Sequence, residues 1–240
     1  MWIDIAYFEI AQGFKKVSVW IYFIIFFALA FLIANVLGGA FSGASIVIGN
    51  QATNVNSPLL IATLQIIFTI FGILICAAIF GNAGYRDYVT NMHPLIFTKP
   101  IKASNYFVGR FCGSFILSLF IQLGITLGLA IGFLMPFLDQ DALGVFRIGA
   151  YLQPILVMVI PNIFLVGSIL FTLAILFRRM LPTYLASVIL LFGYLTSSNL
   201  TGDIETRWIA ALLDPFGGAA VDDLVRYWTP AEQDNLLIPM

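Results

Sequence analysis

Residues 17–36 read VSVWIYFIIFFALAFLIANV, a run of 20 residues without a charged side chain. An α-helix needs about 20 apolar residues to cross the hydrocarbon core of a bilayer, so this run predicts a membrane-spanning helix. Lys15 and Lys16 precede it, as basic residues precede the apolar region of a signal peptide. That region is only about 7–15 residues long, so the length here favours a retained span.

The rest of the chain repeats this character. Of its 240 residues, 61% are hydrophobic and 10% are charged, whereas soluble domains carry about 25% charged residues. Four further apolar runs follow, at 58–80, 111–138, 151–177 and 181–200. They are continuous rather than alternating, which indicates helices and not barrel strands. We therefore predict an all-α integral membrane protein with five membrane-spanning helices.

Basic residues predict how these helices are oriented. With the N-terminus in the cytoplasm, eight of the eleven Lys and Arg residues fall on the inner side: Lys15, Lys16, Arg86, Lys99, Lys102, Arg110, Arg178 and Arg179. Only Arg147, Arg207 and Arg226 fall outside. The positive-inside rule favours this topology, and with it a multi-pass protein whose N-terminus is cytoplasmic.

The two ends of the chain lie outside the five runs. Residues 1–16 predict an amphipathic helix in the cytoplasmic membrane interface. Its apolar positions at helical spacing are Ile3, Ala6 or Tyr7, Ile10 and Phe14, and the polar positions are Asp4, Glu9, Gln12 and Lys16. The alternative is a helix that simply extends the first span. Residues 201–240 form a polar outer segment that ends in NLLIPM, an apolar beginning after which we expect a sixth span.

Few residues suggest chemistry. The net charge of −1 provides no basic field for nucleic acid. The only histidine, His93, cannot build the common zinc sites, and the chain lacks a P-loop and a G-x-S-x-G motif. No charged residue interrupts the five runs, which argues against ion coupling. Cys76 and Cys112 lie in apolar runs and are expected to pack. We expect no metal, no catalytic residue and no cofactor in this chain.

Uncharged polar residues and glycines inside the runs are expected to join helices. The polar residues are Gln65, Thr69, Gln122, Thr126, Gln153, Asn162, Ser168 and Thr172. They commonly form hydrogen bonds between helices, although Gln122 or Asn162 could line a substrate path. Gly124, Gly128 and Gly132 form a ladder that predicts close helix packing, within the chain or between protomers.

The fourth span contains Pro154 and Pro161, which predict a kinked or broken helix.

The cytoplasmic loop 81–110 is the most polar connection between two spans. In the loop, GNAGYRDYVTNM at 81–92 predicts a continuing helix that ends before Pro94, LIFTKP predicts an extended break, and Ser104 is the expected N-cap of the next helix. The result would be a basic and aromatic helical elbow. The alternative is a solvated loop whose Lys and Arg side chains reach the membrane surface.

The loop residues resemble a known family. YRDYVTNMHPLIFTKPIKASNYFVGRF is similar to the cytoplasmic loop of type-2 ABC exporter permeases, with a motif matched by Leu95, Thr98, Pro100, Ile101, Tyr106, Gly109 and Arg110. The order of interfacial helix, spans and elbow also matches. LLDPFGGAAVDDLVRYWTPAEQ, at 212–233, is similar to the outer segment of bacterial permeases fused to a zinc aminopeptidase-like domain.

This resemblance implies the membrane subunit of an ATP-driven exporter in the bacterial inner membrane. Such subunits pair as homo- or heterodimers in membrane lipid and seat the elbow, as a coupling helix, on separate ATPase subunits that bind ATP and Mg. The implied ATPase contacts are Arg86, Asp87, Tyr88, His93, Pro94, Lys99, Pro100, Lys102, Tyr106 and Arg110. Two features depart from the family. The acidic residue common at the start of the elbow is not at Asn82 or Gly84, and a sixth span is expected but absent here.

Two other functions stay open from the sequence. One is a membrane anchor that transports nothing and holds a partner or an appended enzyme domain. The other is an intramembrane enzyme, for which His93 is the only candidate residue and no catalytic constellation is evident.

Overall fold

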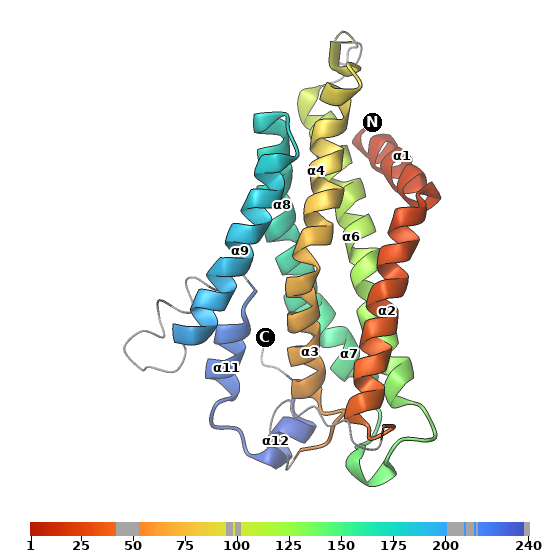
Figure 1. The fold of residues 1–240 in the computed structure, drawn as a ribbon, viewed down its shortest axis with the longest axis vertical. Coiled ribbons are helices and arrows are strands. Elements are labelled where there is room, and N and C mark those ends of the chain that lie inside the picture. Colours follow the sequence, from red (N-terminus) through yellow and green to blue (C-terminus); the bar gives the residue numbers. More distant parts are fainter. Residues whose placement is uncertain are drawn as a thin grey trace.

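The computed structural model of the protein describes residues 1–41, 53–94, 98, 102–200, 209, 214 and 216–237. Over these residues every regular element is a helix, and the long helices run along one common axis (Figure 1). The elements are α1 (Trp2–Lys15), α2 (Val17–Leu37), α3 (Pro58–Phe71), α4 (Ile73–Val89), α6 (Ala103–Phe133), a 3-10 turn η1 (Gln140–Ala142), α7 (Ile148–Pro154), a π-helical segment η2 (Ile155–Val159), α8 (Ile160–Phe177), α9 (Leu181–Leu200), α11 (Gly218–Val225) and α12 (Pro230–Asn235).

The prediction of an all-helical protein is confirmed over the described residues. Its long apolar helices are consistent with a membrane protein, but they are fewer than the five predicted spans. Within the described residues, three helices are long and apolar enough to cross a membrane: Val17–Leu37, Ala103–Phe133 and Ile148–Phe177. The bent pair α3 and α4 makes a possible fourth. The predicted fifth span, 181–200, forms helix α9 with these bounds, but its described apolar part, Leu181–Ser197, is shorter than the three candidate spans and is not counted with them.

The second predicted span is broken at Gly72. Its helix begins as expected, with Pro58 in the first turn and the Ser57 hydroxyl accepting a hydrogen bond from Leu60 N–H. At Gly72 the axis then bends by 48°. A Cβ atom at Gly72 would lie 2.1 Å from Nε2 of Gln122, so the missing side chain admits Gln122 to the backbone. A polar side chain inserted beside a glycine is a recognised cause of such kinks.

The two prolines of the fourth span have a milder effect than predicted. The run from Ile148 to Phe177 stays one helical span, with the π-helical segment η2 between Pro154 and Pro161. Neither proline can donate a backbone hydrogen bond. The wider π-helical turn accommodates the missing bonds, so the span is neither broken nor sharply kinked there.

The glycine ladder packs within the chain. A Cβ atom on Gly124, Gly128 or Gly132 would lie 2.9, 2.4 or 2.6 Å from an atom of α2. The backbones of α2 and α6 therefore lie too close together for any side chain at these positions. The sequence left open whether the ladder packs within the chain or between protomers. The structure shows packing within the chain, because α2 and α6 belong to the same chain.

Polar side chains inside the bundle follow two patterns. Gln65 donates from Nε2 to Tyr151 O (3.2 Å), and Asn162 donates from Nδ2 to Phe216 O (2.9 Å), so these two join separate elements as predicted. Thr69 and Thr172 instead donate to backbone oxygens of their own helices. For such hydroxyls the prediction of bonds between helices is wrong, because a carbonyl four residues earlier is always within reach.

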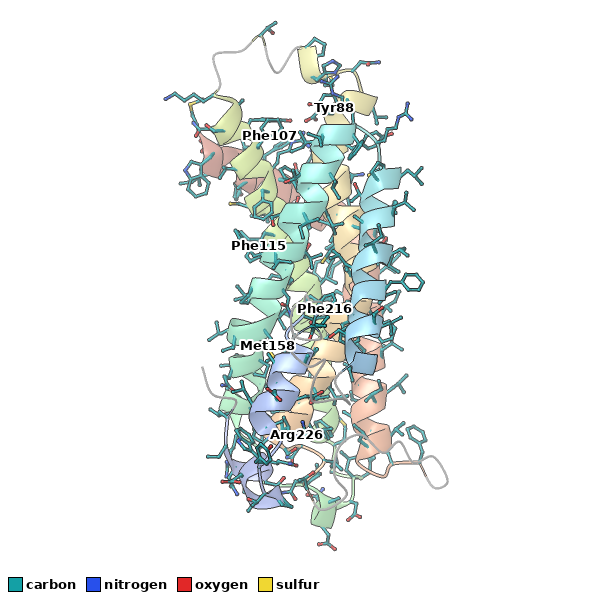
Figure 2. The ribbon with its side chains drawn as sticks, turned by 90° about the vertical axis from the view of Figure 1, so that its left-hand side faces the viewer. Tyr88, Phe107, Phe115, Met158, Phe216 and Arg226 are labelled. Atoms are coloured by element: carbon teal, nitrogen blue, oxygen red, sulfur yellow. The ribbon has the colours of Figure 1, made fainter. Side chains whose placement is uncertain are left out.

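The connections gather at two opposite ends of the bundle. The N-terminus, the segment after α4 and the turn between α8 and α9 lie at one end, which we call the elbow end; α11 and α12 lie towards the other (Figure 1). The end of α4 projects beyond the ends of α8 and α9. Figure 2 likewise places Tyr88 at the elbow end and Arg226 at the opposite end.

Candidate functional site

Three consecutive residues at the end of α4 contact three different parts of the protein. Successive side chains on an α-helix point about 100° apart, so Arg86, Asp87 and Tyr88 spread around more than half of the helix. Arg86 reaches α1, Asp87 reaches α6, and Tyr88 reaches the turn after α8. Through this triplet, the end of α4 joins α1, α6 and the turn after α8 at the elbow end.

The first contact joins α4 to α1. Arg86 Nη2 donates to Glu9 Oε2 over 2.9 Å, and the Glu9 side chain is 7% exposed. Removing one member of a buried ion pair leaves an uncompensated charge, so this pair holds α1 against the bundle. A separate helix α1 has formed here because the backbone is extended at Lys16 (φ −80°, ψ 123°), which rules out a simple extension of α2.

The second contact joins α4 to α6. Asp87 accepts hydrogen bonds from the Arg110 guanidinium and from the Tyr106 hydroxyl. Arg110 is 6% exposed, also donates to Ala83 O over 2.7 Å, and lies 5.1 Å from the centre of the Tyr106 ring. Both charges are therefore paired and hydrogen bonded, which is the condition for burying them without a large penalty.

The third contact joins α4 to the α8–α9 turn and to the elbow. The guanidinium of Arg178 lies 4.9 Å from the centre of the Tyr88 ring, a cation–π distance. Arg178 itself is left-handed (φ 52°) and ends α8. On the elbow side, the ring of His93 lies 5.2 Å from that of Tyr88. Tyr88 thus connects the start of the elbow to two transmembrane helices.

The elbow differs in detail from its prediction. Helix α4 ends at Val89, before the predicted end at Met92, because the chain turns at Asn91 with φ 52°. Thr98 N–H donates to Pro94 O over 3.2 Å. The predicted extended break, with Lys99 and Pro100, otherwise lies outside the described residues.

The helix after the elbow begins one residue before its predicted cap. Helix α6 starts at Ala103 and its N-cap is Lys102, without a side-chain hydrogen bond, so the prediction of Ser104 as N-cap is wrong. Ser104 lies in the first turn and is exposed. Because α6 continues unbroken to Phe133, the elbow helix and the third span are one rigid element.

The predicted contact residues fall into two groups. Arg86, Asp87, Tyr88, Tyr106 and Arg110 are half-buried or buried, and their polar groups bond or stack within the chain. By contrast, Pro94 and Lys102 are exposed. The structure therefore separates an inner set, which holds the helices together, from an outer set, which a partner could reach.

Glu9 is the site residue that sequence reasoning missed. The helical pattern of residues 1–16 predicts that Glu9 lies on the polar side of this helix, yet it is buried together with Ala6 and Gly13. Ala6, Glu9 and Gly13 recur at helical spacing. The position of an acid between two small residues is therefore the sequence feature that could have indicated that Glu9 is buried. The apolar Ile3 and Tyr7 are instead 60% and 74% exposed. The bundle therefore leaves these apolar side chains uncovered, and the placement of this helix in the membrane interface stays a prediction.

Replacing Glu9 by glutamine is expected to loosen α1. Arg86 would keep only a neutral acceptor, which is expected to cost about 1–3 kcal/mol locally. Hydrogen–deuterium exchange should then speed up in α1 and not in α2. Asp4→Asn is the matched control, since Asp4 pairs only with the terminal amine on the exposed face and such pairs contribute little. Equal protection of α1 in Glu9→Gln and wild-type protein would contradict the role of this ion pair.

No group of three His, Cys, Asp or Glu side chains suited to a metal ion occurs among the described residues. Cys76 and Cys112 are both free thiols. Comparison with known proteins adds no assignment, since no protein-family model and no curated protein matches the chain. The site is thus a set of packed charges and aromatic rings at the elbow end that connects α4 to α1, α6 and α8.

Proposed function

We propose that the protein is the membrane subunit of an ATP-driven ABC exporter, in which the elbow after α4 receives the movement of a separate ATPase. The contacts of the Arg86-Asp87-Tyr88 triplet carry this proposal. A displacement of the elbow would act on the end of α4 and, through three bonded neighbours, on α1, α6 and α8 together. Such rigid coupling of several helices to one protruding segment is what a transport subunit driven from outside the membrane requires.

The distribution of charge supports the same function. The inner-side basic residues that the structure describes lie on the helices and turns of the elbow end. Arg226 lies towards the other end, as does Arg147, which bonds to Asn235 of α12. By the positive-inside rule the elbow is then cytoplasmic, where ATP is available. The chain has no P-loop, so the energy source on this proposal is a partner that binds ATP and Mg.

Further components follow from the resemblance of the loop to type-2 ABC exporter permeases. On this proposal the protein resides in the bacterial inner membrane, pairs with a second permease subunit and carries no catalytic residue of its own. Arg86, Asp87 and Arg110 then act as transmitting residues inside the subunit, while Pro94 and Lys102 lie at its contact with the ATPase. His93, half-buried against Tyr88, lies between these two sets.

Reversing the charge of Lys102 tests the proposal. Lys102→Glu is expected to lower the affinity for the co-expressed P-loop ATPase by about fivefold, because an exposed contact charge is worth about 1 kcal/mol. The measurement is recovery of the ATPase with the tagged membrane subunit. Lys15→Glu is the matched control, an exposed lysine at the same end of the bundle.

Two results would count against an exporter subunit. One is the absence of a P-loop ATPase, both among neighbouring genes and among proteins that co-purify with the wild type. The other is equal ATPase recovery by wild-type, Lys102→Glu and Lys15→Glu proteins. Either result would favour the membrane anchor that transports nothing.

A further inference from the structure

A cavity of about 340 Å³ lies at the elbow end, apart from the triplet contacts of Asp87 and Tyr88. A water molecule occupies about 30 Å³ in the liquid, so this space is large enough for a chemical group of many atoms. Its walls come from α1, α2, α4, α6 and the start of α9. They include Lys16, Ser18, Tyr22, Ser114 and Tyr184.

The charge around this cavity is positive. Lys16 lines it and belongs to none of the ion pairs found among the described residues. Partial burial, followed by the positive charge of Arg86, lowers the pKa of Lys16 below its ordinary value; the Glu9 carboxylate opposes this shift, and Arg110 adds to it. Glu9 also lines the cavity, but its carboxylate is bonded to Arg86. Lys16 is therefore left as the uncompensated charge.

Two further features of the cavity wall favour an anion. Helix α2 is 21 residues long, and its N-terminus, next to Ser18 in the cavity wall, has no side-chain cap. Uncapped N–H groups and the helix dipole favour an anion. Independently, Ser114 lines the cavity, is 1% exposed, and its Oγ has no hydrogen-bond partner. A buried hydroxyl without a partner is uncommon in proteins and here points to a missing acceptor.

We propose that this cavity binds the phosphate group of an anionic membrane phospholipid, with Lys16 pairing with the phosphate and Ser114 and the N-terminus of α2 donating hydrogen bonds to it. The inference does not depend on the exporter function. It assigns a lipid site to the junction between α1 and α2.

The position of the cavity favours a lipid over free phosphate as the source of that group. Lys16 directly precedes the first residue of a span whose outward residues are apolar, with Val17 70% and Ile21 49% exposed. Acyl chains can lie along this surface while the headgroup enters the cavity. A lipid needs exposed apolar residues next to its phosphate site, because its acyl chains must contact them. A free phosphate ion makes no use of such residues.

The test uses the protein purified in a lipid-free detergent and titrated with short-chain phosphatidylglycerol, with phosphatidylcholine and with inorganic phosphate. Phosphatidylglycerol is expected to raise Tm in a saturable manner. Lys16→Gln is expected to weaken the apparent affinity about tenfold, since a hydrogen bond to a charged group contributes on that scale. Ser114→Ala, which leaves the cavity intact, should weaken it about threefold and provides a second variant if Lys16→Gln folds poorly.

Lys15→Gln is the matched control, because it removes the neighbouring positive charge without removing a residue of the cavity wall. Retained binding in Lys15→Gln together with loss in Lys16→Gln would support the site. Equal loss in both variants would overturn it, since general charge attraction would then explain binding. Equal stabilisation by phosphatidylcholine, no stabilisation by phosphatidylglycerol, or the same Lys16-dependent effect from inorganic phosphate would each overturn the assignment to an anionic lipid.

Discussion

Replacing Arg110 by methionine is expected to lower the free energy of unfolding by about 3–5 kcal/mol, the usual cost of leaving the partner of a buried ion pair unpaired. Asp87 would lose its cationic partner, and Ala83 O would lose a donor at 2.7 Å. The Tyr106 hydroxyl alone cannot neutralise the remaining carboxylate. Chemical unfolding in mixed lipid–detergent micelles measures the loss.

A double variant separates the buried charge from the lost packing. Arg110→Met with Asp87→Leu removes both charges and is expected to recover most of the stability, because a buried ion pair can often be replaced by apolar residues at little cost. Arg226→Met at the opposite, exposed end should change stability by less than about 0.5 kcal/mol. If the double variant were as unstable as Arg110→Met, the ion pair would not be the source of the effect.

Replacing Gly128 by alanine is the second change with a large expected effect. The new Cβ would lie 2.4 Å from Phe27 O and 2.9 Å from the Ala30 Cβ, both in α2. Neither a backbone oxygen nor a Cβ atom can move without its helix, so α2 and α6 must separate. We expect a loss of about 1–3 kcal/mol, measured as a lower Tm and a lower free energy of unfolding, and a larger loss for Gly128→Leu.

Gly149→Ala is the matched control for this variant. Gly149 is also helical, in α7, but a Cβ there would meet only Leu237 at 3.7 Å, an ordinary contact. Since alanine favours a helix over glycine by about 0.5–1 kcal/mol, this variant should be neutral or slightly more stable. Equal behaviour of the two variants would show that close packing of α2 and α6 does not limit stability.

The site could be predicted only in part from the sequence. Basic and aromatic residues identified the elbow and its end of the molecule, because hydropathy and charge are local properties of a segment. Their partners were not predictable in the same way. Glu9 and Arg86 are 77 positions apart, and Asp87 and Arg110 are 23 apart. Nothing in the local pattern indicates which charges will meet when helices pack.

The sequence by itself determined the class of protein, since a charge-free run such as 17–36 can bury its backbone in a bilayer only as a helix. It also determined that α6 would have a smooth glycine face. The tertiary structure decided which helix covers that face, where the second span bends, and that Glu9 lies inside. It also placed the Arg86-Asp87-Tyr88 triplet where α4 meets α1, α6 and the end of α8. The physical reason is that burial and ion pairing depend on neighbours from distant segments, whereas membrane insertion depends on the composition of one segment at a time.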